Sequence, residues 1–431
     1  MGFIQVSRGT RDILPEEVIY WQHVEATARE LLQQAAYREL RTPIFEQTNL
    51  FERGIGEATD VVGKEMYTFN DRGDRSITLR PEGTAGAVRA YIENKLYAQG
   101  GVQRLWYIGS MFRYERPQTG RQRQFHQIGV ECLGSIDPRA DAEVIAIAAQ
   151  LLQSLGVPEW TLSLNSLGTS EDRQRYRDAL VNYLDQYKDD LDPDSQDRLQ
   201  RNPLRILDSK DAKTQEIAKA APNILGYLDT DSQQHFDRVQ QLLTDLDIAY
   251  KLNPCLVRGL DYYTHTAFEF ELDGLGAQAT VCGGGRYDGL VTELGGPDTP
   301  AVGWAIGMER LILLLQNAEL TLNQSLDFYC VARGLEAEAQ ALILCQNLRK
   351  QGFSVEMDLS GSTFSKQFKR ADRSGAIACV ILGETEACDR TVQLKWLISG
   401  EQESLLQKDL INQSQQLREK LMATKSANSS S

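Results

Sequence analysis

Two strand-like segments with a polar loop between them constrain the fold of this chain more than any other feature. Residues 104–115 and 124–132 are rich in aromatic and β-branched side chains, and Pro117 and Gly120 lie between them. Such runs, bounded by Pro and Gly, are typical of strands joined by a turn or loop. We therefore predict two antiparallel strands joined by a loop at residues 116–123.

One face of this hairpin is unusually polar. Successive strand residues point to opposite faces of a sheet, so alternate residues can be assigned to the same face. The residues on the polar faces are Tyr107, Arg113 and Glu115 in the first strand and Phe125, Gln127 and Glu131 in the second. Ile128, Val130 and Cys132 take the other face of the second strand, which is typical of a core. The polar face could be a solvated surface with cross-strand ion pairs or a site for polar ligands, and periodicity leaves both interpretations open.

Hydrophobic spacing predicts the domain organisation. Pro15 and the later apolar spacing indicate a helix over residues 15–36. Residues 165–250 are polar and helical in pattern, and we interpret about 170–250 as an insertion. Strand-like segments at 328–331, 353–355 and 376–382 alternate with helical segments at 336–350 and 365–373, which predicts a separate α/β domain. We expect domains at 1–325 and 326–421, and a disordered tail at 422–431.

Composition excludes several classes of protein. No apolar run reaches the roughly 18–20 residues that span a bilayer, and the start of the chain lacks the apolar core of a signal peptide. Seven cysteines without a CxxC pair indicate reduced thiols in the cytoplasm. The four histidines show no HExxH spacing, so no zinc site is predicted.

The charge pattern bears on nucleic-acid binding. The net charge is −14, which by itself argues against a nucleic-acid partner. However, residues 104–123 carry five arginines against Glu115 alone. Because steering depends on the local field rather than on the total charge, small basic patches remain able to contact RNA.

Three arginines, Arg113, Arg258 and Arg310, lie at or near the ends of strand-like or glycine-rich segments. Arginine offers a planar, permanently charged group suited to phosphate and carboxylate oxygens. The carboxylates and phenols that accompany them are Glu82, Glu131, Tyr262, Tyr263 and Tyr287. This combination suggests nucleotide-dependent activation of a small zwitterion, although structural ion pairs would use the same residue types. Neither a P-loop nor a dinucleotide fingerprint occurs.

Five ordered motifs resemble those of the histidyl-tRNA synthetase family of class II aminoacyl-tRNA synthetases, over about residues 5–420. They are residues 41–46 (motif 1), 112–115 with 123–127 and Glu131 (motif 2), 256–263, 281–289, and 303–310 (motif 3). The resemblance implies an α+β fold. It consists of a class II antiparallel sheet flanked by helices, a helical insertion, and a C-terminal α/β anticodon-binding domain with residues 364–372 as its most recognisable stretch.

The resemblance also implies a role for each candidate residue. Arg113 would hold the α-phosphate of ATP, and Arg258 would stabilise charge there during attack by the substrate carboxylate. Glu115 would contact the adenine edge, with Phe125 and Arg310 stacked on the two ring faces. The residues implied for the histidine α-amino group are Glu82, Thr84 and Gln127, and those implied for its imidazole are Glu131, Tyr262, Tyr263 and Tyr287. Whether both adjacent tyrosines face the ligand stays open, because neighbouring strand residues point to opposite faces.

The implied activity is ATP-dependent attachment of L-histidine to tRNA(His). Histidyl-adenylate would form first, and the acyl group would then pass to the 3′-hydroxyl of the terminal adenosine. Mg²⁺ would accompany the β- and γ-phosphates, Arg116 and Gln118 would meet the tRNA acceptor end, and motif 1 would form a homodimer interface. The alternative is a non-catalytic regulatory paralogue acting in histidine biosynthesis. That paralogue generally lacks the Arg258–Tyr263 segment and the anticodon domain, and both are present here.

Overall fold

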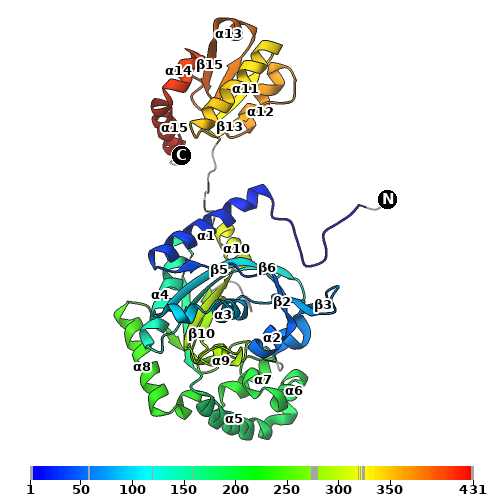
Figure 1. Ribbon diagram of the computed structural model, residues 1–431, viewed down its shortest axis with the longest axis vertical. Helices are drawn as coiled ribbons and strands as arrows, with labels where there is room; N and C mark the ends of the chain where they lie inside the picture. The colour runs from blue at the N-terminus through cyan, green and yellow to red at the C-terminus, as the bar shows by residue number, and fades with distance from the viewer. Residues whose placement is uncertain are drawn as a thin grey trace. The chain divides into compact units, whose positions relative to one another are not determined.

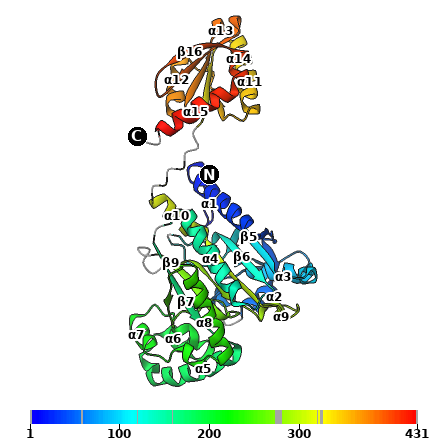
Figure 2. The same ribbon diagram turned by 90° about the vertical axis from the view of Figure 1, so that its left-hand side faces the viewer.

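The chain forms two compact units, residues 1–320 and 321–431. The computed structural model describes residues 3–56, 59–118, 120–157, 159–272, 280–318, 320, 322 and 326–428. The division falls a few residues before the boundary expected from the sequence. Figures 1 and 2 show the fold of each unit in two views.

An eight-stranded sheet organises the first unit. Its strands follow the order β1-β5-β6-β11-β10-β9-β7-β8, and only the pairs β1/β5 and β7/β8 are parallel. The strand bounds are β1 Arg38–Glu39, β5 Gln103–Phe112, β6 Gln124–Leu133, β7 Trp160–Ser166, β8 Lys251–Leu252, β9 Thr264–Leu272, β10 Thr280–Arg286 and β11 Ala301–Gly307. The predicted hairpin is β5 and β6, which pair from Gln103↔Leu133 to Phe112↔Gln124. β5 therefore ends at Phe112, and Arg113 and Glu115 lie in the loop rather than in the strand.

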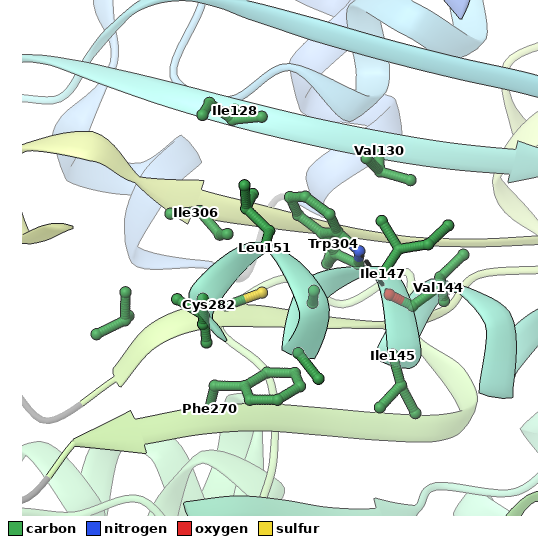
Figure 3. Packing of buried hydrophobic residues seen from close by; sticks show 14 of the residues in the cluster. Ile128, Val130, Val144, Ile145, Ile147, Leu151, Phe270, Cys282, Trp304 and Ile306 are labelled. Atoms are coloured by element: carbon green, nitrogen blue, oxygen red, sulfur yellow. Dashed lines mark hydrogen bonds between the residues drawn. The ribbon is translucent and has the colours of Figure 1, made fainter. Parts of the chain in front are cut away.

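Helices α1 (Pro15–Gln34), α4 (Pro138–Ser154) and α10 (Met308–Asn317) cover one face of this sheet, and buried residues of α8 (Thr230–Asp245) join the same core. Alternate residues of the strands, including Ile128 and Val130, pack against α4 in the main core (Figure 3). Trp304 anchors this contact, because its indole Nε1 donates a hydrogen bond to the carbonyl of Val144 at 2.8 Å. This layer accounts for the apolar face predicted for the second strand of the hairpin.

The opposite face carries α3 (Thr84–Glu93) and a second, smaller core. A three-stranded antiparallel sheet in the order β2-β4-β3 adjoins it. The remaining elements here are β2 Phe45–Gln47, α2 Thr48–Ile55, β3 Tyr67–Asn70, β4 Ser76–Leu79 and α9 Leu290–Glu293.

The polar middle of the chain is a helical insertion between β7 and β8. Its helices are α5 Ser170–Leu184, α6 Pro193–Arg201, α7 Ala212–Lys219 and α8 Thr230–Asp245. Each begins at a side-chain cap, contributed in turn by Thr169, Asp192, Asp211 and Asp229. Cap oxygens satisfy the free N–H groups of a first turn, so three of the many acidic residues of this segment serve to start helices.

A five-stranded sheet with strand order β13-β12-β14-β15-β16 forms the second unit. The elements are β12 Phe328–Ala332, α11 Leu335–Lys350, β13 Val355–Met357, α12 Phe364–Arg373, β14 Ala378–Leu382, α13 Glu384–Asp389, β15 Thr391–Trp396, β16 Gln402–Leu406, α14 Gln407–Asn412 and α15 Ser414–Asn428. The predicted β-α-β-α-β order corresponds to β12 through β14, and sequence reasoning missed β15 and β16.

The end of the chain corrects one expectation. α15 continues through Met422 to Asn428, so this part of the tail is helical rather than disordered. The stretch contains no Gly or Pro that would end a helix. Residues 429–431 of the predicted tail lie outside the described part of the chain.

None of the helices described in either unit has the length and apolar character of a membrane span.

Candidate functional site

A cavity of about 870 Å³ opens in the first unit. Its lining brings together the residues predicted for nucleotide and amino-acid binding: Glu82, Thr84, Arg113, Glu115, Phe125, Gln127, Glu131, Arg258, Tyr262, Tyr263, Tyr287 and Arg310. Arg116 and Gln118, predicted to meet the tRNA, are exposed loop residues outside this lining. Gln127 and Glu131 project from the face of β6 opposite to the main core. The polar face of the hairpin is therefore largely a cavity wall rather than a solvated surface.

Glu131 forms the floor of one end of the cavity. Its side chain is fully buried, and three hydroxyl groups donate hydrogen bonds to its carboxylate. Thr84 Oγ1 and the Tyr107 hydroxyl bond to Oε1 at 2.7 and 3.2 Å, and the Tyr287 hydroxyl bonds to Oε2. We call these three residues the hydroxyl cluster. Gly303 leaves room for the Glu131 carboxylate, because a Cβ at this position would lie 2.1 Å from Glu131 Oε2.

A second buried carboxylate, that of Glu82, lies at the start of α3. It accepts hydrogen bonds from the backbone N–H groups of Thr84 at 2.6 Å and Ala85 at 2.8 Å. The first N–H groups of a helix have no partner within the helix and favour a negative charge. The same turn thus orients Glu82 through its backbone and Glu131 through the Thr84 hydroxyl.

Burial controls the protonation of these acidic groups. It raises the pKa of Glu131 to about 8, although the hydroxyl cluster partly opposes this shift. Burial also raises the pKa of Glu82, whose backbone hydrogen bonds act in the opposite direction. The pKa values of Tyr262 and Tyr287 lie well above the usual tyrosine value for the same reason. The phenols therefore stay neutral and remain hydrogen-bond donors at physiological pH.

Tyr262 and Tyr263 both line the cavity because they lie in the turn that precedes β9, not in the strand itself. Their ring centroids are 4.6 Å apart, and the ring of Tyr262 meets that of Tyr287 edge-on at 5.6 Å. The three rings form an aromatic wall with polar tips. Such a wall suits a flat ligand that also forms hydrogen bonds.

Arg113 occupies the loop end of the cavity. Its Nε donates to the carbonyl of Pro81 at 2.9 Å, and its guanidinium lies 5.4 Å from the centre of the Phe125 ring. Glu115 lies between two arginines, at 3.9 Å from Arg113 and 3.6 Å from Arg121. These ion pairs lie within the loop and do not join the two strands of the hairpin.

Arg258 approaches from the segment before β9. It pairs with Glu269, whose other oxygen accepts a hydrogen bond from Thr280 at 2.8 Å. Gly283 clears its path, because a Cβ there would lie 2.2 Å from the Arg258 guanidinium. The buried Nε of Arg258 has no hydrogen-bond partner in the part of the chain that the structure describes. Sequence reasoning missed Glu269, since nothing local distinguishes it from a strand residue on a solvated face.

Arg310, in the first turn of α10, supplies the third cation. Its Nη1 donates to the carbonyl of Thr280. Burial, together with nearby Arg121, lowers the pKa of the Arg310 guanidinium, which still remains charged near neutral pH. A guanidinium held in this way favours the approach of an anion or of a flat π-system.

The helical insertion contributes to the lining as well. Side chains from residues 192–211, among them Arg198 and Arg205, line the cavity. Arg198 contacts Asp60 at 3.2 Å, and Asn202 donates to Asp261 at 2.9 Å. Sequence reasoning assigned no site residue to this segment, and its polar helical pattern carried no signal for one.

The assembled chemistry favours binding over nucleophilic catalysis. Three arginines offer charge to phosphate or carboxylate oxygens, and buried carboxylates with neutral phenols offer partners to amine and imidazole nitrogens. Within the described residues, no group of three or more His, Cys, Asp or Glu side chains could hold a metal ion. The cavity can therefore place a charged nucleotide beside a small zwitterionic ligand.

Comparisons with known proteins agree with this chemistry. The family model described as histidyl-tRNA synthetase matches residues 9–311, and the anticodon binding domain model matches residues 327–417. A histidine–tRNA ligase of Acaryochloris marina is 86% identical over 425 residues, which is 99% of each chain. One of Cyanothece sp. is 73% identical over 98% of each chain. The apo crystal structure of Staphylococcus aureus histidyl-tRNA synthetase is 39% identical and has a TM-score of 0.81, and the match covers 95% of this chain and 99% of that one. The chain therefore belongs to the histidyl-tRNA synthetase family of class II aminoacyl-tRNA synthetases.

Proposed function

We propose that this protein attaches L-histidine to tRNA(His) at the expense of ATP. The observation that carries this proposal is the convergence of Arg113, Arg258 and Arg310 with Glu131 and its donors Thr84 and Tyr287 in one cavity. Membership of the family supports it, because the relatives described above are histidine–tRNA ligases.

The first step would join histidine to the nucleotide. The histidine carboxylate attacks the α-phosphorus of ATP, pyrophosphate leaves, and histidyl-adenylate forms. Arg113 would hold the α-phosphate, and Arg258 would neutralise charge that develops during attack. Catalysis then consists of positioning and electrostatic stabilisation, and no protein nucleophile is needed.

Histidine itself would be recognised at both ends. The buried Gln127 Oε1 has no hydrogen-bond partner among the described residues, so it offers an acceptor to an α-ammonium group beside Glu82 and Thr84. Glu131, Tyr262, Tyr263 and Tyr287 would surround the imidazole. A site built to bond both ring nitrogens rejects analogues that leave its polar groups unpaired.

The adenine of ATP would lie at the loop end of the cavity. Glu115 would bond its exocyclic amine edge, while Phe125 and Arg310 would cover its two faces. The guanidinium of Arg113 already lies near the Phe125 ring, so the phosphate-binding and ring-binding groups are neighbours.

Magnesium would enter as a companion of ATP. Glu269 and Glu271 both line the cavity and lie two residues apart on β9. Mg²⁺ in nucleotide sites is bound by one or two carboxylates, with phosphate oxygens and water completing its shell. Glu271 fits such an ion, which would neutralise the β- and γ-phosphates, whereas both oxygens of Glu269 are already bound by Arg258 and Thr280.

In the second step, the 3′-hydroxyl of the terminal adenosine of tRNA(His) would take the acyl group. Arg116 and Gln118 would contact the acceptor end, and the second unit would bind the anticodon. The exposed Lys366 and Lys369, three residues apart on α12, offer the second unit's RNA contacts. We place the protein in the cytoplasm, where its seven free cysteines would stay reduced.

We also propose that the protein is a homodimer. Ile44, Phe45 and Phe69 are each about half exposed, on or beside the three-stranded sheet. Apolar side chains gathered in this way favour burial against another chain. Sedimentation analysis tests this: a dimer is expected for the wild type, and a monomeric species for Phe69→Glu.

ATP–pyrophosphate exchange tests the enzyme itself. Exchange should depend on histidine and fall at least a hundredfold in Arg258→Ala, because a charge at the reacting centre is lost. Arg72→Ala, which removes an exposed arginine of the same unit, is the matched control and should retain wild-type exchange. If clean wild-type protein shows no exchange with any amino acid, the proposal is wrong.

A further inference from the structure

Tyr107 is a buried residue next to the histidine site that none of the implied roles includes. It lies in the middle of β5, is only 3% exposed, and its hydroxyl is 3.2 Å from Glu131 Oε1. Tyr107 is not part of the cavity lining, so it reaches a ligand only through Glu131.

Two glycines hold the Tyr107 ring in place. A Cβ at Gly83 or at Gly129 would come within 2.1 Å of ring atoms of Tyr107. Gly129 is the residue paired with Tyr107 across β5 and β6, and Gly83 precedes α3. The ring therefore fills the volume that two side chains would otherwise occupy, which restricts its hydroxyl to one position.

The hydrogen bonds of Glu131 show what this fixed hydroxyl does. A carboxylate has about four acceptor positions, two on each oxygen. Thr84 and Tyr107 fill both positions on Oε1, and Tyr287 fills one on Oε2. One acceptor position remains, and it lies on Oε2.

We propose that Tyr107 is a positioning residue of the histidine site: its wedged hydroxyl holds Glu131 so that a single oxygen, Oε2, accepts the imidazole N–H. This inference rests on the proposed function, because it takes histidine as the ligand of the cavity. Tyr107 thus acts on histidine affinity and not on ATP.

The hydroxyl also favours the ionised form of Glu131. A donor to a carboxylate stabilises its charge, and Tyr107 acts in this direction together with Thr84 and Tyr287. Burial and the neighbouring Glu82 act in the opposite direction. Without the Tyr107 hydroxyl, Glu131 needs a higher pH before it can accept an imidazole N–H.

Tyr107→Phe tests the proposal, with Tyr37→Phe as the matched control. Tyr37 is also 3% exposed, but it lies in the core on the opposite face of the sheet. Histidine binding is measured by calorimetry, and the KM values for histidine and ATP by pyrophosphate exchange. We expect about tenfold weaker histidine binding in Tyr107→Phe, the size of one hydrogen bond to a charged group. The KM for ATP and the melting temperature should stay near wild type, and Tyr37→Phe should bind histidine normally.

The pH dependence separates positioning from a purely structural role. The ratio of variant to wild-type dissociation constants at each pH cancels the titration of histidine itself. We expect this ratio to be larger at pH 7 than at pH 9, where a larger fraction of Glu131 is ionised in both proteins. In a double-mutant cycle with Glu131→Gln, the two substitutions should be non-additive, because Tyr107 acts through Glu131.

The results that would overturn the role of Tyr107 differ from those that would overturn the ligase activity. Wild-type histidine affinity in Tyr107→Phe, or additive effects in the cycle, would overturn the role of Tyr107 and leave the proposed function intact. Conversely, a wild type that binds histidine without exchange would refute the ligase activity, while the calorimetric comparison would still decide the role of Tyr107.

Discussion

Two carboxylates are buried on opposite faces of the eight-stranded sheet, and their surroundings differ. Asp141, on α4, is paired with the fully buried Arg286 of β10, which also contacts Asp288. Glu131, on β6, accepts hydrogen bonds from hydroxyl groups, and no ion pair of its carboxylate is found within the described residues. One carboxylate is neutralised by the protein, and the other is left for a ligand to neutralise.

The pKa shifts of the two acids follow from this difference. Burial would raise the pKa of Asp141, but the charge of Arg286 and the nearby His235 lower it below its usual range. Burial raises the pKa of Glu131 to about 8, because hydroxyl donors compensate only in part. The comparison shows that a buried carboxylate is a structural element when a cation accompanies it and a binding element when only neutral donors do.

Removing Arg286 from its pair with Asp141 should change the free energy of unfolding more than substitution of Glu131 or His235. Arg286→Met leaves Asp141 buried without its partner, and we expect the free energy of unfolding to fall by about 3–5 kcal/mol. Urea unfolding followed by tryptophan fluorescence measures this, since four of the five tryptophans lie in the first unit. The double variant Asp141→Leu/Arg286→Met is the control and should recover part of the loss. A loss below about 1 kcal/mol in Arg286→Met would contradict the structural role of the pair.

Removing the charge of Glu131 should raise the free energy of unfolding, whereas Arg286→Met lowers it. Between pH 4.5 and about 8, Glu131 is ionised in the unfolded chain and protonated in the native one. The native state then binds more protons, so stability falls as pH rises through this window. Glu131→Gln removes that dependence, and we expect it to be about 3 kcal/mol more stable than wild type at pH 8.5 and nearly equal at pH 5.

The same urea experiment at the two pH values checks this prediction. Glu419→Gln, which changes an exposed carboxylate of the second unit, should leave the pH dependence of wild type unchanged. A Glu131→Gln variant that is less stable than wild type at pH 8.5 would mean that Glu131 is a structural acid like Asp141.

Substitution of His235, which lies beside Asp141 and Arg286, should change the free energy of unfolding least. His235 Nε2, on α8, lies 3.4 Å from Asp141 Oδ2, a distance too long for a strong hydrogen bond. Because Asp141 keeps Arg286, we expect His235→Gln to cost less than about 1 kcal/mol in urea unfolding. A cost equal to that of Arg286→Met would show that the insertion is needed to neutralise Asp141.

Much of the architecture could be predicted from the sequence, because strand alternation and helical spacing are visible in short stretches of the chain. Alternation placed Glu131 and Gln127 on one face of a strand, and helical spacing located α1 and α11. The same alternation could not tell a solvated face from a cavity wall, since that depends on what packs above the strand. Glu131 is buried because Thr84 of α3, Tyr107 of β5 and Tyr287, directly after β10, contact its carboxylate.

The residues that sequence reasoning missed act through distant contacts. Tyr107 was assigned to the polar face, but its role depends on Gly83 and Gly129 meeting its ring. Glu269 becomes recognisable as a site residue through its ion pair with Arg258, which the sequence does not reveal. In the second unit, β15 was missed although its buried Val392, Leu394 and Trp396 alternate with half-buried residues. β16 contains no buried residue, so its place in the sheet rests on its pairing with β15.

The hydroxyl cluster determines how late in synthesis the histidine pocket can be completed. The bond between Tyr287 and Glu131 joins residues 156 positions apart, whereas those of Thr84 and Tyr107 span 47 and 24. Contacts across so long a stretch form late, because a large loop must close first. A ribosome that has made β5 and β6 has produced only part of the pocket. Until β10 and Tyr287 have emerged, the growing chain lacks the last donor to Glu131.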